Sequence, residues 1–301
     1  MGTKITVEFR LPKSTNSTVD AEALFESVFG EFQRLDLMMN PWNPDSELAR
    51  VNREASARTV RTTAEIVDVV ARALHYSQLS DGAFDISFAS VGQHYNYREG
   101  QAPSPEVLAR DRDKIDYTAI ELDRDSREIR FLKAGLQIDL GGIAKGYAVD
   151  RAIAMLSNAG VSAAVVSAGG DNRILGDMGD RARTVGIRHP RREGEYAVLM
   201  PLADTAISTS GDYERFFIRD GVRYHHILDP GTGESAAKVQ SASVLAEQAI
   251  DCDALSTTVF VLGVERGLAL INALPGIDAI IIDGSGRLHY SEDLLLSVDS
   301  K

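Results

Sequence analysis

The chain has 301 residues, a length that suits one large core or two domains. Hydrophobic residues make up 44% and charged residues 25%, as in an ordinary globular protein, and the net charge of −12 argues against nucleic acid or an anionic membrane surface as a general partner. The single cysteine, Cys252, excludes an internal disulfide and a metal site built from several cysteines.

The first residues lack the charged-then-apolar layout of a secretory signal. No apolar run approaches the ~20 residues that a membrane helix needs. We therefore expect no membrane insertion and, for the chain as written, a cytoplasmic protein. If a signal or lipid-anchor segment precedes Met1 in the full-length protein, the expected compartment is the periplasm.

Apolar residues alternate over 3–9, which predicts a strand, and residues 14–18 are typical of a polar turn. Helical spacing then predicts a helix that ends near Pro41, since a proline disfavours helix at the residue before it. The residues predicted to share its apolar face are Ala23, Leu24, Val28, Phe32 and Leu35. Residues 41–52 are predicted to form an exposed loop, in which Trp42 is a packing aromatic.

A second amphipathic helix is predicted over 63–80, and a turn at Asp81-Gly82 follows it. Gly82 and Ala83 leave room for a flat ring to approach the backbone. Residues 101–115 are typical of a charged surface helix or loop, and residues 117–122 with 128–132 predict a hairpin.

Residues 136–152 change from strand to turn to helix within a short stretch. Leu136, Ile138 and Leu140 alternate with polar residues, two glycines follow, and a helix is predicted from Ala144. The free N–H groups at the start of this helix, its dipole and the charge of Lys145 would suit a phosphate. The segment matches neither a P-loop nor a dinucleotide fingerprint, so a plain strand-to-helix turn is an equal alternative at this point.

A strand is predicted over 163–167, followed by a Gly-Gly-Asp turn, with further strands at 184–188 and 196–200. Residues 208–211 offer hydroxyls and a flexible amide that could line phosphate or ribose oxygens, or could form a capped turn. The turn at 229–233 places His226 near the end of a strand. A single histidine of this kind is more often structural than catalytic.

The C-terminal part is predicted to contain a strand at 242–246, helices at 249–262 and 264–273, a strand at 277–283 and a solvated acidic tail after Ser291. Asp253 and Thr257 are four residues apart, so both project from one face of the first of these helices. A carboxylate and a hydroxyl are oxygen ligands of the type that Mg²⁺ takes, although the spacing is common by chance. No linker tract or repeat divides the chain. We therefore expect one integrated α+β unit over residues 1–301, in which mixed or antiparallel sheets pack with helices.

Four strings carry a resemblance: DLGGIAKGYAVD at 139–150, TSGDYERF at 209–216, HILDPGTG at 226–233 and DALSTTVFVLG at 253–263. Together they resemble the ApbE family of FAD:protein FMN transferases, and the resemblance extends over nearly the whole chain. Two segments depart from the family pattern. Asn40-Pro41-Trp42 stands where the family has hydroxyl residues, and residues 88–100 lack the usual Gly-Pro-Leu and Leu-Trp-Gly strings.

The resemblance implies Mg²⁺-dependent transfer of FMN from FAD to a Ser or Thr hydroxyl of an acceptor flavoprotein with a Ser/Thr flavinylation motif, and release of AMP. It implies catalytic roles for His226, rather than His225, and for Asp253. It also implies that the Ala144 carbonyl, Asp253 and Thr257 hold Mg²⁺. The residues implied to contact FAD are Met39, Ala83, Phe84, Asp85, Asp139, Lys145, Ser208, Thr209, Ser210 and Gly211.

The resemblance also implies that the loop with Trp42 borders the flavin, and that the Gly-Gly-Asp turn with Arg173 has a secondary place against the ligand. Two alternatives remain open. The protein could be an FAD pyrophosphatase that yields FMN and AMP, because nothing in the motifs separates water from a protein hydroxyl. It could also bind FAD without chemistry, an alternative that the two altered segments keep open.

Overall fold

The computed structural model describes residues 2–11, 20–177 and 183–299, so the turn predicted at 14–18 lies outside the described residues. The helices are α1 (Ala21–Met39), α2 (Glu47–Glu54), α3 (Ala64–Leu79), α4 (Ala89–Gly92), α5 (Pro105–Asp111), α6 (Ala144–Asn158), α7 (Ala249–Leu262), α8 (Val264–Asn272) and α9 (Glu292–Asp299). Short 3₁₀ turns are η1 (Ile86–Phe88), η2 (Arg112–Lys114) and η3 (Tyr117–Ala119). The strands are β1 (Ile5–Arg10), β2 (Val60–Arg61), β3 (Ile120–Asp123), β4 (Glu128–Phe131), β5 (Ala163–Ala168), β6 (Asp171–Leu175), β7 (Arg183–Arg188), β8 (Tyr196–Leu202), β9 (Ala206–Gly211), β10 (Phe216–Arg219), β11 (Val222–His225), β12 (Val239–Ala246), β13 (Asp278–Asp283) and β14 (Leu288–Tyr290).

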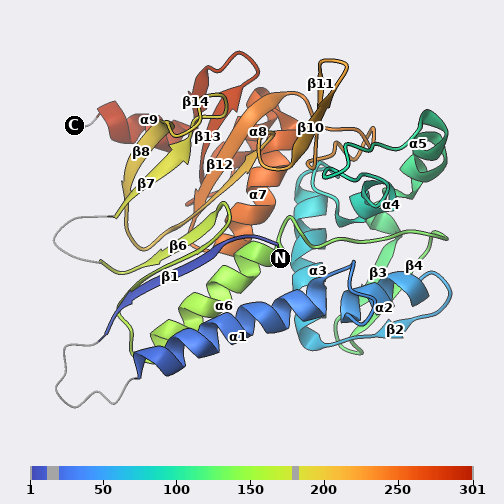
Figure 1. The fold of residues 1–301 in the computed structure, drawn as a ribbon, viewed down its shortest axis with the longest axis horizontal. Helices are drawn as coiled ribbons and strands as arrows, with labels where there is room; N and C mark the ends of the chain where they lie inside the picture. Colours follow the sequence, from blue (N-terminus) through green and yellow to red (C-terminus); the bar gives the residue numbers. More distant parts are fainter. Residues whose placement is uncertain (1, 12–19, 178–182, 300–301) are drawn as a thin grey trace.

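A seven-stranded sheet in the order β1-β5-β6-β9-β12-β13-β14 organises the fold, and all of its pairings are antiparallel. Figure 1 shows α6 and α7 beside this sheet, with α3 and the smaller elements beyond them. The hairpin β7–β8 packs on the opposite face of the sheet, over a small cluster that contains Ile187, Ile207 and Leu245. The α+β class is therefore confirmed, with antiparallel pairing throughout the described sheets.

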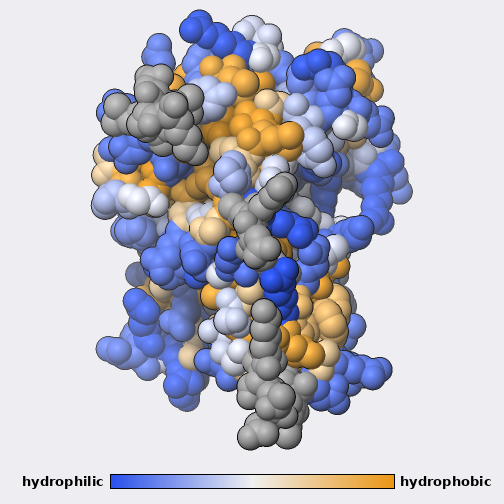
Figure 2. Space-filling view, turned by 90° about the vertical axis from the view of Figure 1, so that its left-hand side faces the viewer, coloured by the Kyte–Doolittle hydropathy of each residue, from blue (hydrophilic) through white to orange (hydrophobic). Residues whose placement is uncertain are grey.

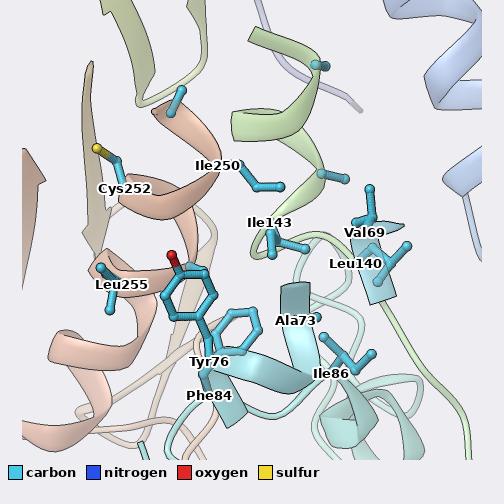
Figure 3. Close-up of a cluster of buried hydrophobic side chains, with 14 of the residues drawn as sticks. Val69, Ala73, Tyr76, Phe84, Ile86, Leu140, Ile143, Ile250, Cys252 and Leu255 are labelled. Carbon is cyan, nitrogen blue, oxygen red and sulfur yellow. The ribbon is translucent and has the colours of Figure 1, made fainter. Parts of the chain in front are cut away.

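Helices α3, α6 and α7 meet in a buried apolar cluster. Figure 3 shows Ala73 and Tyr76 of α3 facing Ile143 near the start of α6 and Leu255 of α7, with Phe84 beneath them. The hydroxyl of Tyr76 donates to Asp251 Oδ1 of α7 at 2.6 Å. These contacts pack α3 against α7 and the start of α6, and this junction is where the candidate site lies.

Two residues of the segment 139–150, Gly146 and Asp150, lie where α6 packs against α7. Gly146 lets the helices touch, because a Cβ at this position would lie 2.2 Å from the Ala249 carbonyl oxygen. Asp150, one turn later, accepts hydrogen bonds from the first amides of α7, at 3.0 Å from Ala249 and 2.9 Å from Ile250. Arg173 pairs with Asp150 at 2.6 Å. The segment therefore fixes the start of α7 as well as the start of α6.

We expect Gly146→Ala to lower the free energy of unfolding by about 1–3 kcal/mol or more, because the clash is with backbone and the helices must separate. Gly30→Ala is the matched control. Gly30 lies inside α1, its Cβ would meet no atom within 4 Å, and alanine should stabilise the helix by up to about 1 kcal/mol. Urea denaturation measures both, and equal midpoints for the two variants would contradict the close contact.

Most of the predicted elements are confirmed, but the expectations for residues 136–140, for residues 41–52 and for Ala23 are wrong. Residues 136–140 are extended yet form no strand, because side chains satisfy their backbone: Asn52 Nδ2 donates to the Ile138 carbonyl at 2.9 Å, and Asn52 Oδ1 accepts from its amide at 2.8 Å. The predicted loop 41–52 contains the start of α2, which Ser46 caps by accepting from the Ala49 amide. The acidic tail after Ser291 is solvated at Glu292 and Asp293, as predicted, and it forms the helix α9. In addition, Ala23 is exposed on α1.

Figure 2 shows the face of the molecule that carries β7, β8 and α9. Polar residues cover most of this face, and apolar residues gather mainly in its upper half, with a smaller group at the lower right. The exposed large apolar side chains include Tyr196 and Leu199 of β8. Within the described ranges, no helix has the length and hydropathy to cross a membrane.

Candidate active site

The candidate site begins at the turn before α6. Leu136, Ile138 and Leu140 are fully buried and anchor the approach to the turn. Asp139 is half-buried at the start of the turn, and the Oδ1 atom of Asp139 accepts a 2.6 Å hydrogen bond from the Gly141 amide. Burial raises the pKa of Asp139, and the Gly141 hydrogen bond partly offsets this. The turn therefore carries a carboxylate that is held in place by its own backbone.

Lys145 in the first turn of α6 links three segments. Its Nζ donates to Asp253 Oδ1 at 2.9 Å and Oδ2 at 3.1 Å, and to the Gly141 carbonyl at 3.0 Å. It also lies 3.2 Å from Asp171 Oδ2, at the start of β6. The Gly146 amide donates to Asp253 Oδ2 at 3.0 Å. The free amide expected at this helix start therefore binds a carboxylate of the protein itself.

The charges at this centre do not balance. Asp171 and Asp253 are both buried, and Lys145 is the cation that pairs with them. Burial, together with the charge of Asp253, raises the pKa of Asp171. Burial alone would lower the pKa of Lys145, but the two carboxylates outweigh it and raise it. The pKa of Asp171 rises to about 7, and when Asp171 is ionised two carboxylates face one ammonium and leave a buried negative charge that a further cation would stabilise.

The residues predicted to hold Mg²⁺ fit such an ion. Asp253 and Thr257 lie one turn apart on α7, and Ala144 immediately precedes Lys145 at the start of α6. Thr257 Oγ1 lies 3.1 Å from Ser210 Oγ, so α7 and β9 bring two hydroxyls together. Oxygen donors and one excess negative charge are what a hard divalent cation binds. No group of three His, Cys, Asp or Glu side chains suited to a metal occurs among the described residues, so backbone and hydroxyl oxygens would complete the ligand set.

Residues 208–211 form most of β9, and the alternation of the strand divides their roles. Ser210 faces α7, where its Oγ also lies 2.9 Å from Ser256 Oγ. The next residue toward the N-terminus, Thr209, points to the other face of the sheet, and its hydroxyl bonds Ser243 at 2.8 Å. The structure thus brings Ser210 to Thr257 and directs the Thr209 side chain away from them.

The segment 83–85 reaches the site through Phe84. A Cβ on Gly142 would lie 3.2 Å from the Phe84 ring and 3.7 Å from Thr257 Oγ1, so the bare glycine keeps the ring and the hydroxyl close to the turn. Ala83 is half-buried beside Phe84. The Asp85 carboxylate has a structural role, because it accepts hydrogen bonds from the Ser87 amide at 2.8 Å and the Tyr117 amide at 2.9 Å.

Met39 lies at the end of α1, where it is buried in the main core. A turn follows Met39, and Asn40 stabilises it because the Asn40 Oδ1 atom accepts a hydrogen bond from the Trp42 amide at 3.0 Å. Trp42 itself is 67% exposed, so the prediction that it packs in the protein is wrong. Its ring is available to a ligand or to solvent.

The two adjacent histidines differ in their environment. His225 is buried, its Nε2 lies 2.7 Å from the Ala236 carbonyl, and its Nδ1 accepts from the Ile227 amide at 3.3 Å. Both of its nitrogens therefore have backbone partners. The buried Nδ1 of His226 has no hydrogen-bond partner among the described residues. Burial, followed by the charge of Arg215, lowers the pKa of His226 to about 3, so the free protein holds a neutral imidazole there.

Sequence reasoning missed the parts played by two residues. Asp171 joins the centre through Lys145, and the signal for it was the Gly-Gly-Asp turn directly after an apolar strand. Arg215 lies near enough to Asp139 and His226 to shift the pKa of each, and its only signal was its place in the string TSGDYERF. Arg173, by contrast, is engaged by Asp150 rather than by this centre.

Comparison with known proteins identifies the family. The model of the ApbE family matches residues 1–281. The FAD:protein FMN transferase of Treponema pallidum is 33% identical over 300 residues, which cover 94% of this chain and 83% of that protein. The FAD:protein FMN transferase of Vibrio cholerae is 30% identical over 266 residues, which cover 84% and 78%.

Solved structures agree with this assignment. The crystal structure of the ApbE protein from Thermotoga maritima matches with a TM-score of 0.86 at 31% identity, over 98% of both chains. The flavin transferase ApbE from Vibrio cholerae matches with a TM-score of 0.87 at 26% identity, over 98% of this chain and 96% of that one. The signature strings, the antiparallel sheet and these matches lead to one assignment: the chain belongs to the ApbE family.

Proposed function

We propose that the protein is a transferase that moves FMN from FAD to a Ser or Thr hydroxyl of an acceptor flavoprotein and releases AMP. The observation that carries the proposal is the meeting of Lys145, Asp253, Thr257 and Ser210 at one junction, in a chain whose relatives bear this enzyme's name. A pyrophosphate bears negative charge, and this junction combines an ammonium with oxygen ligands for a cation.

The reaction is a phosphoryl transfer. The acceptor oxygen forms a bond to the phosphorus of the FMN half, the bond from that phosphorus to the bridging oxygen breaks, and AMP leaves with the electron pair. When bound at Ala144, Asp253 and Thr257, Mg²⁺ would supply Lewis-acid polarisation of the diphosphate. Lys145 would hold the Asp253 carboxylate in place and reduce the repulsion between this carboxylate and the substrate.

His226 is the candidate to accept the proton of the acceptor hydroxyl or to orient the phosphate. Its neutral ring is in the form that can accept a proton. A bound diphosphate would raise its pKa from the low value of the free protein, because negative charge nearby favours the imidazolium. The Ser210 hydroxyl would offer a hydrogen bond to a phosphate or ribose oxygen.

Product analysis tests the proposal against its two alternatives. The protein is incubated with FAD, Mg²⁺ and a synthetic peptide of the pattern Asp-Gly-x-Thr-Gly-Ala-Thr. Covalent flavin on the peptide supports the transferase. Free FMN and AMP without labelled peptide would show a pyrophosphatase, and unchanged bound FAD would show a binding protein.

We expect FAD to quench the fluorescence of Trp42, the only tryptophan of the chain, because its exposed ring borders the proposed flavin site. A titration should give saturable quenching. The control is Trp42→Phe, in which FAD affinity is followed by flavin fluorescence. If calorimetry shows FAD binding while Trp42 emission stays unchanged, the loop does not border the flavin.

A further inference from the structure

The hairpin β10–β11 connects two segments of the candidate site. β9 ends at Gly211 before it, and His226 directly follows it. Figure 1 shows the hairpin rising between α7 and the part of the chain that carries α4 and α5. A ligand that lies along this hairpin would therefore reach the candidate site at its base.

One face of the hairpin is continuous with His226. The His226 amide donates to the Arg215 carbonyl at 3.1 Å, which extends the β10–β11 ladder by one pair. Directly opposed residues of an antiparallel pair have their side chains on the same face. The residues that share a face with His226 are therefore Arg215, Phe217, Tyr224, Arg219 and Val222. We call this set the His226 face.

Aromatic rings hold Arg219 at the far end of the His226 face. Phe217 and Tyr224 stack with centroids 4.9 Å apart and planes at 6°. The Arg219 guanidinium lies 4.9 Å from the centre of the Tyr224 ring. Tyr97, from the segment that departs from the family pattern, packs on Phe217 at 6.2 Å. Arg219 is thus fixed in position before any partner arrives, which reduces the entropy lost on binding.

Arg215 and Arg219 are positive and exposed, and no carboxylate of the described residues lies within salt-bridge distance of either. Residues 215–225 contain three arginines and one aspartate, in a chain of net charge −12. Val222, next to Arg219, is 54% exposed. The His226 face is therefore a local positive strip with an apolar side chain, and its charge is complementary to a carboxylate.

We propose that the His226 face is the docking surface for the acceptor protein, an inference that rests on the proposed function. The acceptor lies along it as an extended segment that passes the rings of Phe217 and Tyr224, which Tyr97 partly covers, with its hydroxyl at His226 and a carboxylate on Arg219. Four residues separate Arg215 from Arg219, which corresponds to about 13 Å of strand. The acceptor therefore carries its carboxylate a few residues from its hydroxyl, and Val222 contacts an apolar side chain beside that carboxylate.

The test compares Arg219→Glu with Arg266→Glu. Arg266 is an exposed arginine of α8, so the two variants change the net charge equally. With the peptide Asp-Gly-x-Thr-Gly-Ala-Thr, Arg219→Glu should raise the KM for the peptide by about tenfold or more, since like charges at an interface repel. Its FAD affinity should stay at the wild-type value. A peptide with Lys in place of Asp should recover most of the loss. Arg266→Glu should match the wild type in all three respects.

Direct binding of a fluorescent peptide, followed by anisotropy, separates this inference from the proposed function. A wild type that binds the peptide but transfers no flavin, with binding weakened in Arg219→Glu alone, supports the docking surface and contradicts the transferase. Equal KM values for Arg219→Glu and Arg266→Glu contradict the docking surface and leave the transferase intact. A wild type that neither binds nor flavinylates the peptide contradicts both.

Discussion

Asp253→Asn should lower the rate of AMP release from FAD by about 10²–10³ or more, the loss typical of removing one group that stabilises developing charge. The amide keeps the shape of the side chain and can still accept from the Gly146 amide, but it removes the negative charge that faces Lys145. The folded state should persist, as circular dichroism will show. Assays of AMP release against Mg²⁺ concentration give the rate and the Mg²⁺ midpoint.

Two threonines of α7 supply a matched control for this prediction. Thr257→Val removes the hydroxyl near Ser210 and should raise the Mg²⁺ midpoint, with a smaller loss than Asp253→Asn, because water can replace a neutral ligand. Thr258→Val makes the same change one residue later, where the hydroxyl bonds only the Ala254 carbonyl of its own helix, at 2.8 Å. The Mg²⁺ midpoint of Thr258→Val should equal that of the wild type. If Asp253→Asn retains the wild-type rate and midpoint, the metal does not bind at these residues.

His226→Ala should lower turnover, whereas His225→Ala should lower stability. His226→Ala should lower turnover by about 10²–10⁴, the usual contribution of a proton-transfer group, and leave the FAD affinity within a few-fold. His225→Ala should lower the denaturation midpoint instead, because it removes a buried ring that packs edge-on against Phe260 and leaves the Ala236 carbonyl and the Ile227 amide without these hydrogen bonds. Turnover per folded molecule should persist. Equal losses of turnover would show that the pair acts as one structural unit.

The low pKa of His226 adds a second readout. Its folded pKa of about 3 lies below the value of 6.5 expected for the unfolded chain, so the unfolded state binds more protons between these two values. The contribution of a neutral His226 to stability is therefore complete above pH 6.5 and is lost as the pH falls toward 3. His226→Ala should lose less stability than the wild type in this window. Urea midpoints at several pH values measure the difference.

Local sequence patterns predicted those elements whose partners are close in the chain or whose periodicity is strong. The helix at 249–262 was predicted with the same bounds as α7, because its length and apolar content allow no other element. Residues 136–140 have the alternation of a strand, but Asn52 takes the place of the neighbouring strand. Nothing near residue 136 in the sequence reveals a partner more than 80 residues away. Of the β10–β11 hairpin, only a strand that ends near His226 was predicted, although Asp220-Gly221 is a typical hairpin turn between the two strands.

The candidate site was predictable to a similar extent. Helical spacing placed Asp253 and Thr257 on one face, since that requires only the geometry of a helix. The pairing of Lys145 with Asp253 joins residues 108 positions apart and depends on how α6 packs against α7. The choice between the two histidines also depended on the resemblance. The structure shows how the two environments differ, because both nitrogens of His225 are bonded to backbone and the buried Nδ1 of His226 is not.

We propose that a protein hydroxyl, rather than water, cleaves FAD. The most direct measurement counts two products of one reaction, AMP by chromatography and flavinylated peptide by mass spectrometry. We expect one peptide-bound flavin for each AMP at every time point, and we expect neither product from a peptide with Ala in place of both Thr residues. AMP formed together with free FMN, at a rate that the peptide does not change, would contradict cleavage by a protein hydroxyl.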